Sequence, residues 1–134
     1  MSLEDQKQQS RQFLTALDKG DEAVLAALTG PEFRFELMTS APGLPAVLDR
    51  EGFLTNLPKV LKELLPNGMN FTFGVTISEG PYVAMEGTSN TPTSTGKIYT
   101  NRYHWHFRFA RGKIVEFKEY MDAYQMIQAF MTND

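Results

Sequence analysis

Residues 97–122 restrict the fold more than any other part of the chain, because two long alternating segments flank a short turn there. Alternation of apolar and polar residues with a period of two is typical of β-strands with one face toward a core. Residues 110–112, Ala-Arg-Gly, predict a three-residue connection in which the glycine takes a positive φ. The sequence therefore predicts a long β-hairpin.

Each strand of this hairpin has an apolar face and a charged face, and polar groups interrupt both apolar faces. A carboxylate among apolar side chains is costly unless it has a partner or a function. Glu119 is therefore the main functional candidate, with a pKa that desolvation would raise into the range useful for general acid–base catalysis. The apolar faces hold Tyr99, Asn101, Tyr103, Trp105, Phe107 and Phe109 on the first strand, and Val115, Phe117, Glu119 and Met121 on the second.

Three residues are candidate catalytic groups: Glu119, Tyr103 and Asn101. The phenol of Tyr103 and the amide of Asn101 could orient a carbonyl group or stabilise an oxyanion beside Glu119. The structural alternative is that Glu119 forms a buried hydrogen bond with one of the neighbouring tyrosines. A sealed carboxyl bonded only to protein would favour this alternative, whereas a carboxyl that faces open space beside Tyr103 would favour catalysis.

Composition limits the possible chemistry. The chain has 134 residues, which suits one domain spanning 1–134, and its 42% hydrophobic content with 10 phenylalanines is typical of a globular protein. A net charge of −3 gives no general attraction to nucleic acid or anionic lipid. The absence of cysteine excludes disulfides and thiolate metal sites. Without a signal peptide or membrane-spanning segment in the sequence, we expect a cytoplasmic protein without membrane contact.

The remaining segments predict helices and strands in the order helix, helix, strand, helix, four strands, helix. Gly20 and Asp21 are suited to end the first helix and cap the second. Pro58 predicts a kink or two short pieces in the third helix, and Asp122 with Gln125 has the form of a capping box before the last. An α+β fold, with a curved antiparallel sheet whose concave face is covered by helices, would bury the apolar faces.

This order and three segments resemble the nuclear transport factor 2-like superfamily, within it the SnoaL-like polyketide cyclase and ketosteroid-isomerase-like branch. The segments are FLTALDKGD, TGKIYTNRYHWHFRF and GKIVEFKEYMD. The resemblance covers nearly the whole chain and implies a cone-shaped α+β roll. That fold carries isomerases, cyclases, hydrolases, dehydratases and non-catalytic modules, so the fold alone does not define the reaction.

The catalytic positions of the resembled proteins match this chain unevenly. The tyrosine and two aspartates of ketosteroid isomerases correspond to Phe13, Leu37 and Trp105, so their standard mechanism is not expected here. Glu36 is one residue from the second of these positions and should face the other way. The SnoaL-like cyclases place an acid/base aspartate three positions after GKIVE, where this chain has Glu119.

The sequence thus predicts a cofactor-independent enzyme that transfers protons on a small, largely apolar carbonyl compound, by isomerisation, aldol-type cyclisation or dehydration. The alternative is a non-catalytic small-molecule-binding or dimerisation module. No nucleotide motif is present, and the His104/His106 pair lies between arginines, so neither a cofactor nor a metal is expected. Beyond the three catalytic candidates, we expect nine residues to line the binding pocket: Tyr99, Trp105, Phe107, Phe117, Met121, Phe13, Leu17, Phe35 and Phe53.

The charged face of the first hairpin strand is a candidate subunit contact. It carries Arg102, His104, His106 and Arg108. A mixed aromatic and charged sheet face suits a symmetric interface, and the resemblance also implies a dimer. We therefore expect a homodimer formed through this convex face, with a small apolar or polyketide-like molecule as ligand and no nucleic acid as partner.

Overall fold

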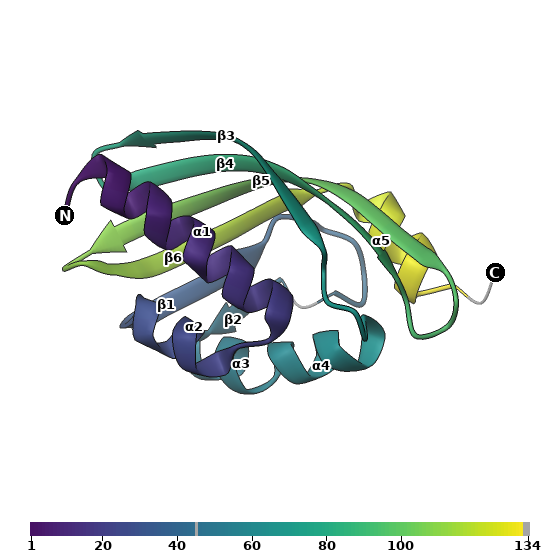
Figure 1. The fold of residues 1–134 in the computed structure, drawn as a ribbon. Helices are drawn as coiled ribbons and strands as arrows, with labels where there is room; N and C mark the ends of the chain where they lie inside the picture. The colour runs from purple at the N-terminus through teal and green to yellow at the C-terminus, as the bar shows by residue number, and fades with distance from the viewer. Residues whose placement is uncertain (45, 133–134) are drawn as a thin grey trace.

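A computed structural model describes residues 1–44 and 46–132. Within these residues six strands form one curved sheet in the order β2-β1-β6-β5-β4-β3, and helices cover its concave face (Figure 1). The predicted α+β fold is confirmed. The strands are β1 (Thr29–Leu37), β2 (Val47–Asp49), β3 (Phe71–Glu79), β4 (Tyr82–Pro92), β5 (Ile98–Ala110) and β6 (Lys113–Met121).

The described part of the chain has five helices, which lie on the concave side and at one end of the sheet (Figure 1). The longest, α1, runs along the sheet and contacts β3 and β4. No helix among residues 1–44 and 46–132 is long and apolar enough to cross a membrane. The helices are α1 (Leu3–Lys19), α2 (Glu22–Leu28), α3 (Arg50–Thr55), α4 (Leu57–Leu64) and α5 (Ala123–Phe130).

Most predicted helix boundaries are confirmed. Gly20 ends α1 in the left-handed conformation, with φ 70°, and Asp21 caps α2 by accepting a hydrogen bond from Val24 N. Pro58 lies in the first turn of α4, because the predicted third helix is two short helices. Asp122 caps α5 through Tyr124 N, but the capping box is not formed: Asp122 N donates to Asn101 instead of to Gln125.

The hairpin turn is shorter than predicted. Ala110 pairs with Lys113, so the turn has two residues, Arg111 and Gly112, with φ 53° and 75°. Two successive positive φ values are typical of a type I′ turn, whose twist matches that of the flanking strands. The three-residue turn was wrong because Ala110 still belongs to the strand. An irregularity near Phe109 also brings Ile114 into the core beside Val115.

One strand pair differs from the predicted antiparallel sheet. β1 lies parallel to β6, with Phe35 opposite Phe117 and Leu37 opposite Glu119, whereas the other neighbouring strands are antiparallel. Part of the predicted loop 40–48 also forms a strand, β2, on the outer edge of β1. The parallel pair places β6 in the middle of the sheet, so Glu119 has a strand on either side.

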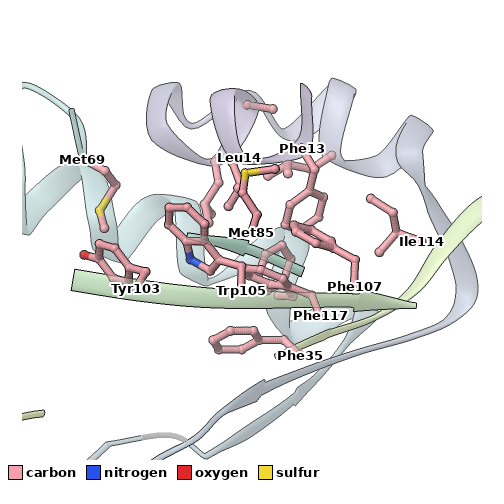
Figure 2. Close-up of a cluster of buried hydrophobic side chains, with 14 of the residues drawn as sticks. Phe13, Leu14, Phe35, Met69, Met85, Tyr103, Trp105, Phe107, Ile114 and Phe117 are labelled. Carbon is pink, nitrogen blue, oxygen red and sulfur yellow. The ribbon is translucent and has the colours of Figure 1, made fainter. Parts of the chain in front are cut away.

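The core between α1 and the sheet is largely aromatic (Figure 2). Phe13 of α1 is fully buried, with its ring 4.9 Å from that of Phe117 and 5.6 Å from that of Phe107, centroid to centroid. Burying one phenylalanine stabilises a fold by about 1.5–3 kcal/mol, so this cluster contributes substantially to holding α1 on the sheet.

Candidate functional site

Glu119 lies on β6 among buried side chains. It pairs with Trp105 of β5 and with Leu37 of β1, and its backbone carbonyl accepts a hydrogen bond from Met38 N. The residue is 8% exposed, although it carries an ionisable carboxyl group. Strands on both sides therefore fix its backbone and aim the side chain into the apolar concave side.

The carboxyl group of Glu119 has one protein partner. Oε1 accepts a hydrogen bond from Trp105 Nε1 at 3.0 Å. The structural alternative predicted a hydrogen bond from a tyrosine instead, and the described residues form none to this carboxyl group. Oε2 has no hydrogen bond within the described residues. It is also not one of their fully buried polar atoms without a partner, so Oε2 keeps some solvent-accessible surface. One carboxyl oxygen is therefore held by Trp105, and the other has no hydrogen bond within the described residues.

Burial changes the acidity of this group. Loss of solvation raises the pKa of Glu119 to about 7, and the hydrogen bond from Trp105 opposes this rise because it stabilises the carboxylate. A carboxyl group with such a pKa populates both protonation states near neutral pH. It can accept a proton or donate one without a large free-energy cost.

Three hydroxyl groups form a buried chain beside this carboxyl. Tyr103 Oη lies 2.9 Å from Ser89 Oγ and donates to Tyr99 Oη at 3.0 Å. Burial raises the pKa of Tyr99 to about 12 and that of Tyr103 further, and the nearby Glu119 contributes to both increases. The two phenols therefore stay protonated at neutral pH and are hydrogen-bond donors, not bases.

Ser89 was missed by the sequence reasoning. The inward face of β4 alternates with a period of two, and Ser89 is its only buried serine, 3% exposed. The available signal was a small polar residue on the face that also carries Val83 and Met85. Its partner could not be identified, because the contact with Tyr103 depends on the register between β4 and β5.

Asn101 is occupied entirely by the protein. Its Nδ2 donates to Tyr99 Oη at 2.8 Å and to the Asp122 carbonyl at 3.1 Å, and its Oδ1 accepts from the backbone N–H groups of Arg102 and Asp122. These bonds explain Asn101 as the anchor that joins the start of α5 to β5. A catalytic role remains a prediction and would require one of these bonds to break.

Eight of the nine residues predicted to line the pocket fall into two groups. The five phenylalanines pack against one another with ring centroids 4.9–6.3 Å apart and are at most 5% exposed, an arrangement that core packing explains. Trp105 and Tyr99 contact the hydroxyl–carboxyl cluster directly, and Met121 pairs with Tyr103. Whether any of them binds a ligand stays a prediction. The five phenylalanines are Phe13, Phe35, Phe53, Phe107 and Phe117.

Leu17 lies at a groove near the end of α1. The groove has a volume of about 600 Å³ and lies between α1, α4 and the segment 65–70. Met69 also lines it, and the side chain of Met69 lies close to Tyr103 (Figure 2).

The convex face of the sheet is open to solvent in the single chain. Arg102 and His104 are exposed, and His106 and Arg108 are partly exposed. Tyr82 lies against His106, with ring centroids 5.4 Å apart. No group of three or more His, Asp or Glu side chains gathers at metal-binding distance in residues 1–44 and 46–132.

The curved sheet and its helices resemble several solved structures, among them NTF2-like proteins. The structure resembles an NTF2-like protein of unknown function from Burkholderia pseudomallei, with a TM-score of 0.83 and 20% identity over 98% of this chain and 100% of that one. IdmH, a proposed polyketide cyclase from Streptomyces antibioticus, gives a TM-score of 0.76 and 22% identity over 95% and 99% of the two chains. At these identities the likeness shows the fold alone.

A third similar structure is an epoxide hydrolase of the LEH-like type from M. tuberculosis, with a TM-score of 0.77 and 18% identity over 96% of this chain and 91% of that one. Comparison with curated protein sequences gave no match. The family model for the SnoaL-like domain matches residues 10–117. The chain belongs to the SnoaL-like family, and the predicted resemblance is confirmed.

Proposed function

We propose that this protein is a cofactor-independent enzyme that transfers protons on a small, largely apolar carbonyl compound. The observation that carries the proposal is Glu119. Its carboxyl group has a pKa of about 7, one oxygen without a hydrogen bond in the described part of the chain, and buried hydroxyl donors nearby. Similarity to a proposed polyketide cyclase and to an epoxide hydrolase supports an enzymatic role.

In the proposed reaction Glu119 acts first as a base. Its carboxylate removes a proton from the carbon next to the substrate carbonyl, and negative charge develops on the carbonyl oxygen. A hydroxyl of the Tyr99–Tyr103 pair donates a hydrogen bond to that oxygen. The Glu119 carboxylic acid then returns the proton. In an isomerisation the proton goes to another carbon, and in a dehydration it goes to the departing hydroxyl group. In an aldol-type cyclisation the enolate carbon attacks a second carbonyl group of the substrate, and the proton goes to the alkoxide that this attack forms.

The mostly uncharged surroundings of Glu119 suit an uncharged, largely apolar substrate. The described residues around Glu119 are apolar or neutral, so an uncharged compound would lose little solvation on entry. The developing enolate is the species that gains from the hydroxyl donors, because it is stronger as an acceptor than the ground-state carbonyl.

One observation favours a second function, a small-molecule-binding module without turnover. Tyr103 is bonded to both Ser89 and Tyr99, and Asn101 is fully used in joining β5 to α5. Side chains that form hydrogen bonds within the protein can maintain the shape of a binding site without taking part in a reaction. The two functions differ in what removal of the Glu119 carboxyl group does.

The test is deuterium exchange of small apolar ketones and enones in D₂O, followed by NMR at the α-carbon. We expect the protein to accelerate exchange for at least one such compound, and Glu119→Gln to reduce the rate by about 10²–10⁴-fold. Tyr103→Phe should cost less, about 10²-fold or below. Glu63→Gln, on the exposed side of α4, is the matched control and should leave the rate unchanged.

Thermal melting of the same variants separates the alternatives. If Glu119 is purely structural, Glu119→Gln melts early, by about 1–3 kcal/mol of unfolding free energy for an impaired buried hydrogen bond, and still exchanges deuterium at the wild-type rate. That pair of results would reject the catalytic proposal.

A further inference from the structure

We propose that Trp105 is a positioning residue whose indole N–H fixes Oε1 of Glu119, so that Oε2 alone gains and loses the catalytic proton. The inference rests on the proposed acid–base function of Glu119. Its structural basis is the 3.0 Å hydrogen bond from Trp105 Nε1 to Glu119 Oε1, between residues that face each other across β5 and β6.

The chemistry of indole makes the two carboxyl oxygens unequal. An indole nitrogen donates a hydrogen bond and cannot accept one. Oε1 must therefore remain an acceptor whether Glu119 is ionised or protonated, as long as this bond exists. The carbonyl oxygen of a carboxylic acid is a stronger acceptor than its hydroxyl oxygen, so the bond from the indole favours the proton of the neutral acid on Oε2, which has no hydrogen bond within the described residues.

Packing prevents the indole from releasing Oε1. Trp105 is 0% exposed, and its ring stacks on Tyr103 with centroids 5.0 Å apart and planes 12° from parallel. Phe71 meets the same ring edge-on at 5.0 Å. Gly87 leaves space for the ring on the β4 side, where any side chain would overlap it. The donor therefore has one accessible orientation.

Other ionisable groups near this pair are few. On the concave face β5 contributes Tyr99 and Tyr103, and burial keeps both protonated through neutral pH. From the neighbouring elements, Asp122 lies at the end of β6, and Asp18 of α1 is bonded to the backbone N–H groups of residues 69–71. The buried inward side chains of β4, and Leu37 and Phe35 of β1, carry no charge.

Charged groups on the opposite face of the sheet are separated from the pair by the sheet itself. They are Arg34 and Glu36 on β1, Glu86 on β4, Arg102, His104, His106 and Arg108 on β5, and Glu116 and Lys118 on β6. Histidine is the side-chain type whose charge ordinarily changes closest to neutral pH, so the two histidines of this set need a control. They are removed in the control described below.

Trp105 is the only tryptophan in the chain, so the proposal has a direct spectroscopic test without substrate. In ¹⁵N-labelled protein the single indole N–H resonance should shift in one step centred near pH 7 as Glu119 ionises. His104→Gln/His106→Gln should retain this step. Glu119→Gln should abolish it, because its side chain cannot ionise. An indole resonance that stays constant from pH 5 to 9, or moves equally in Glu119→Gln, would overturn the proposal.

Two further variants keep the test decisive. If Glu119→Gln fails to fold, Glu119→Asp replaces it: the shorter side chain withdraws the carboxyl group from the indole, so the amplitude of the step should fall. Trp105→Phe removes the donor but keeps an aromatic ring. In the deuterium-exchange assay it should move the midpoint of the pH–rate profile upward, whereas a purely structural role would lower the rate at every pH without moving the midpoint.

These measurements separate failure of the positioning role from failure of the proposed function. If the indole follows Glu119 but Glu119→Gln still exchanges deuterium normally, positioning of the carboxyl group is supported and its use in catalysis is rejected. If Glu119→Gln loses exchange while the indole never responds to pH, catalysis by Glu119 stands and the role of Trp105 is rejected.

Discussion

Gly87 and Trp105 are matched in size across the β4–β5 pair. A Cβ atom added to Gly87 would lie 2.6 Å from Cη2 of the indole and 2.9 Å from the Thr72 carbonyl oxygen. Both separations are shorter than van der Waals contact. The absence of a side chain at residue 87 therefore allows the indole to reach Glu119.

The first prediction follows from this fit. Gly87→Ala should destabilise the protein by about 1–3 kcal/mol, because an overpacked core forces side chains out of their preferred positions. It should also displace the indole and weaken its bond to Glu119. Chemical unfolding gives the stability, and tryptophan fluorescence reports the displacement.

Gly74→Ala is the matched control on the adjacent strand β3. Its added Cβ would meet the Glu86 carbonyl oxygen at 3.3 Å and nothing closer, so a small adjustment accommodates it. We expect near-wild-type fluorescence from this variant. Equal effects of the two substitutions would show that the space around Trp105 is not restrictive.

The second prediction concerns Asn101. Asn101→Ala removes the side chain that joins β5 to the backbone of Asp122, the N-cap of α5. We expect a loss of about 1–3 kcal/mol from the unsatisfied backbone and hydroxyl groups left behind. Backbone amides of residues 123–130 should exchange with deuterium faster than in the wild type, as measured by mass spectrometry.

Thr100→Ala, on the exposed side of the same strand, is the control for Asn101→Ala. It should leave hydrogen exchange in α5 unchanged. If Asn101→Ala also leaves α5 protected, the helix is held by its apolar contacts, such as that of Phe130 with Tyr99, and not by the amide.

The third prediction is the homodimer expected through the convex face. Light scattering at tens of micromolar protein should give about twice the chain mass of 15.2 kDa. His106→Glu/Arg108→Glu should reduce the mass to that of one chain, because the change puts two negative charges in place of an imidazole and a guanidinium on this face. Lys59→Glu on exposed α4 reverses charge elsewhere and should leave the dimer intact. A wild-type mass of one chain would exclude the dimer.

Local patterns in the sequence were sufficient to predict the hairpin and to select Glu119. A carboxyl group at an apolar position of an alternating strand is predicted to be buried, whatever the position of that strand in the sheet. The partner of Glu119 was not predictable in the same way, because pairing depends on register. A three-residue turn would have placed other residues opposite one another, whereas the two-residue turn at Arg111 and the irregularity near Phe109 bring Trp105 to Glu119.

Non-local contacts account for the other differences. The parallel pairing of β1 with β6 joins strands separated by more than 70 residues, and no local pattern encodes it. Asn101 was interpreted as a catalytic candidate from its neighbours on β5. Its bonds to Asp122 depend on where the chain turns after β6, which the sequence of β5 does not contain.

The fourth prediction is the pH dependence of stability produced by Glu119. Its pKa is about 7 in the folded protein and close to the ordinary value of 4.5 when unfolding exposes it. Between these values the folded state binds more protons than the unfolded state, so the free energy of unfolding falls as pH rises. The contribution of Glu119 is complete below about pH 4.5 and lost by about pH 7, with a total of about 3 kcal/mol.

Urea unfolding of wild type and Glu119→Gln at several pH values measures this effect. The variant cannot ionise at residue 119, so its stability relative to wild type should improve steadily from pH 4.5 to 7 and then level off. Glu63→Gln, with an exposed side chain, should run parallel to the wild type throughout. A constant difference between wild type and Glu119→Gln over this range would mean that the buried carboxyl group titrates as it does in water, which would remove the basis for its acid–base role near neutral pH.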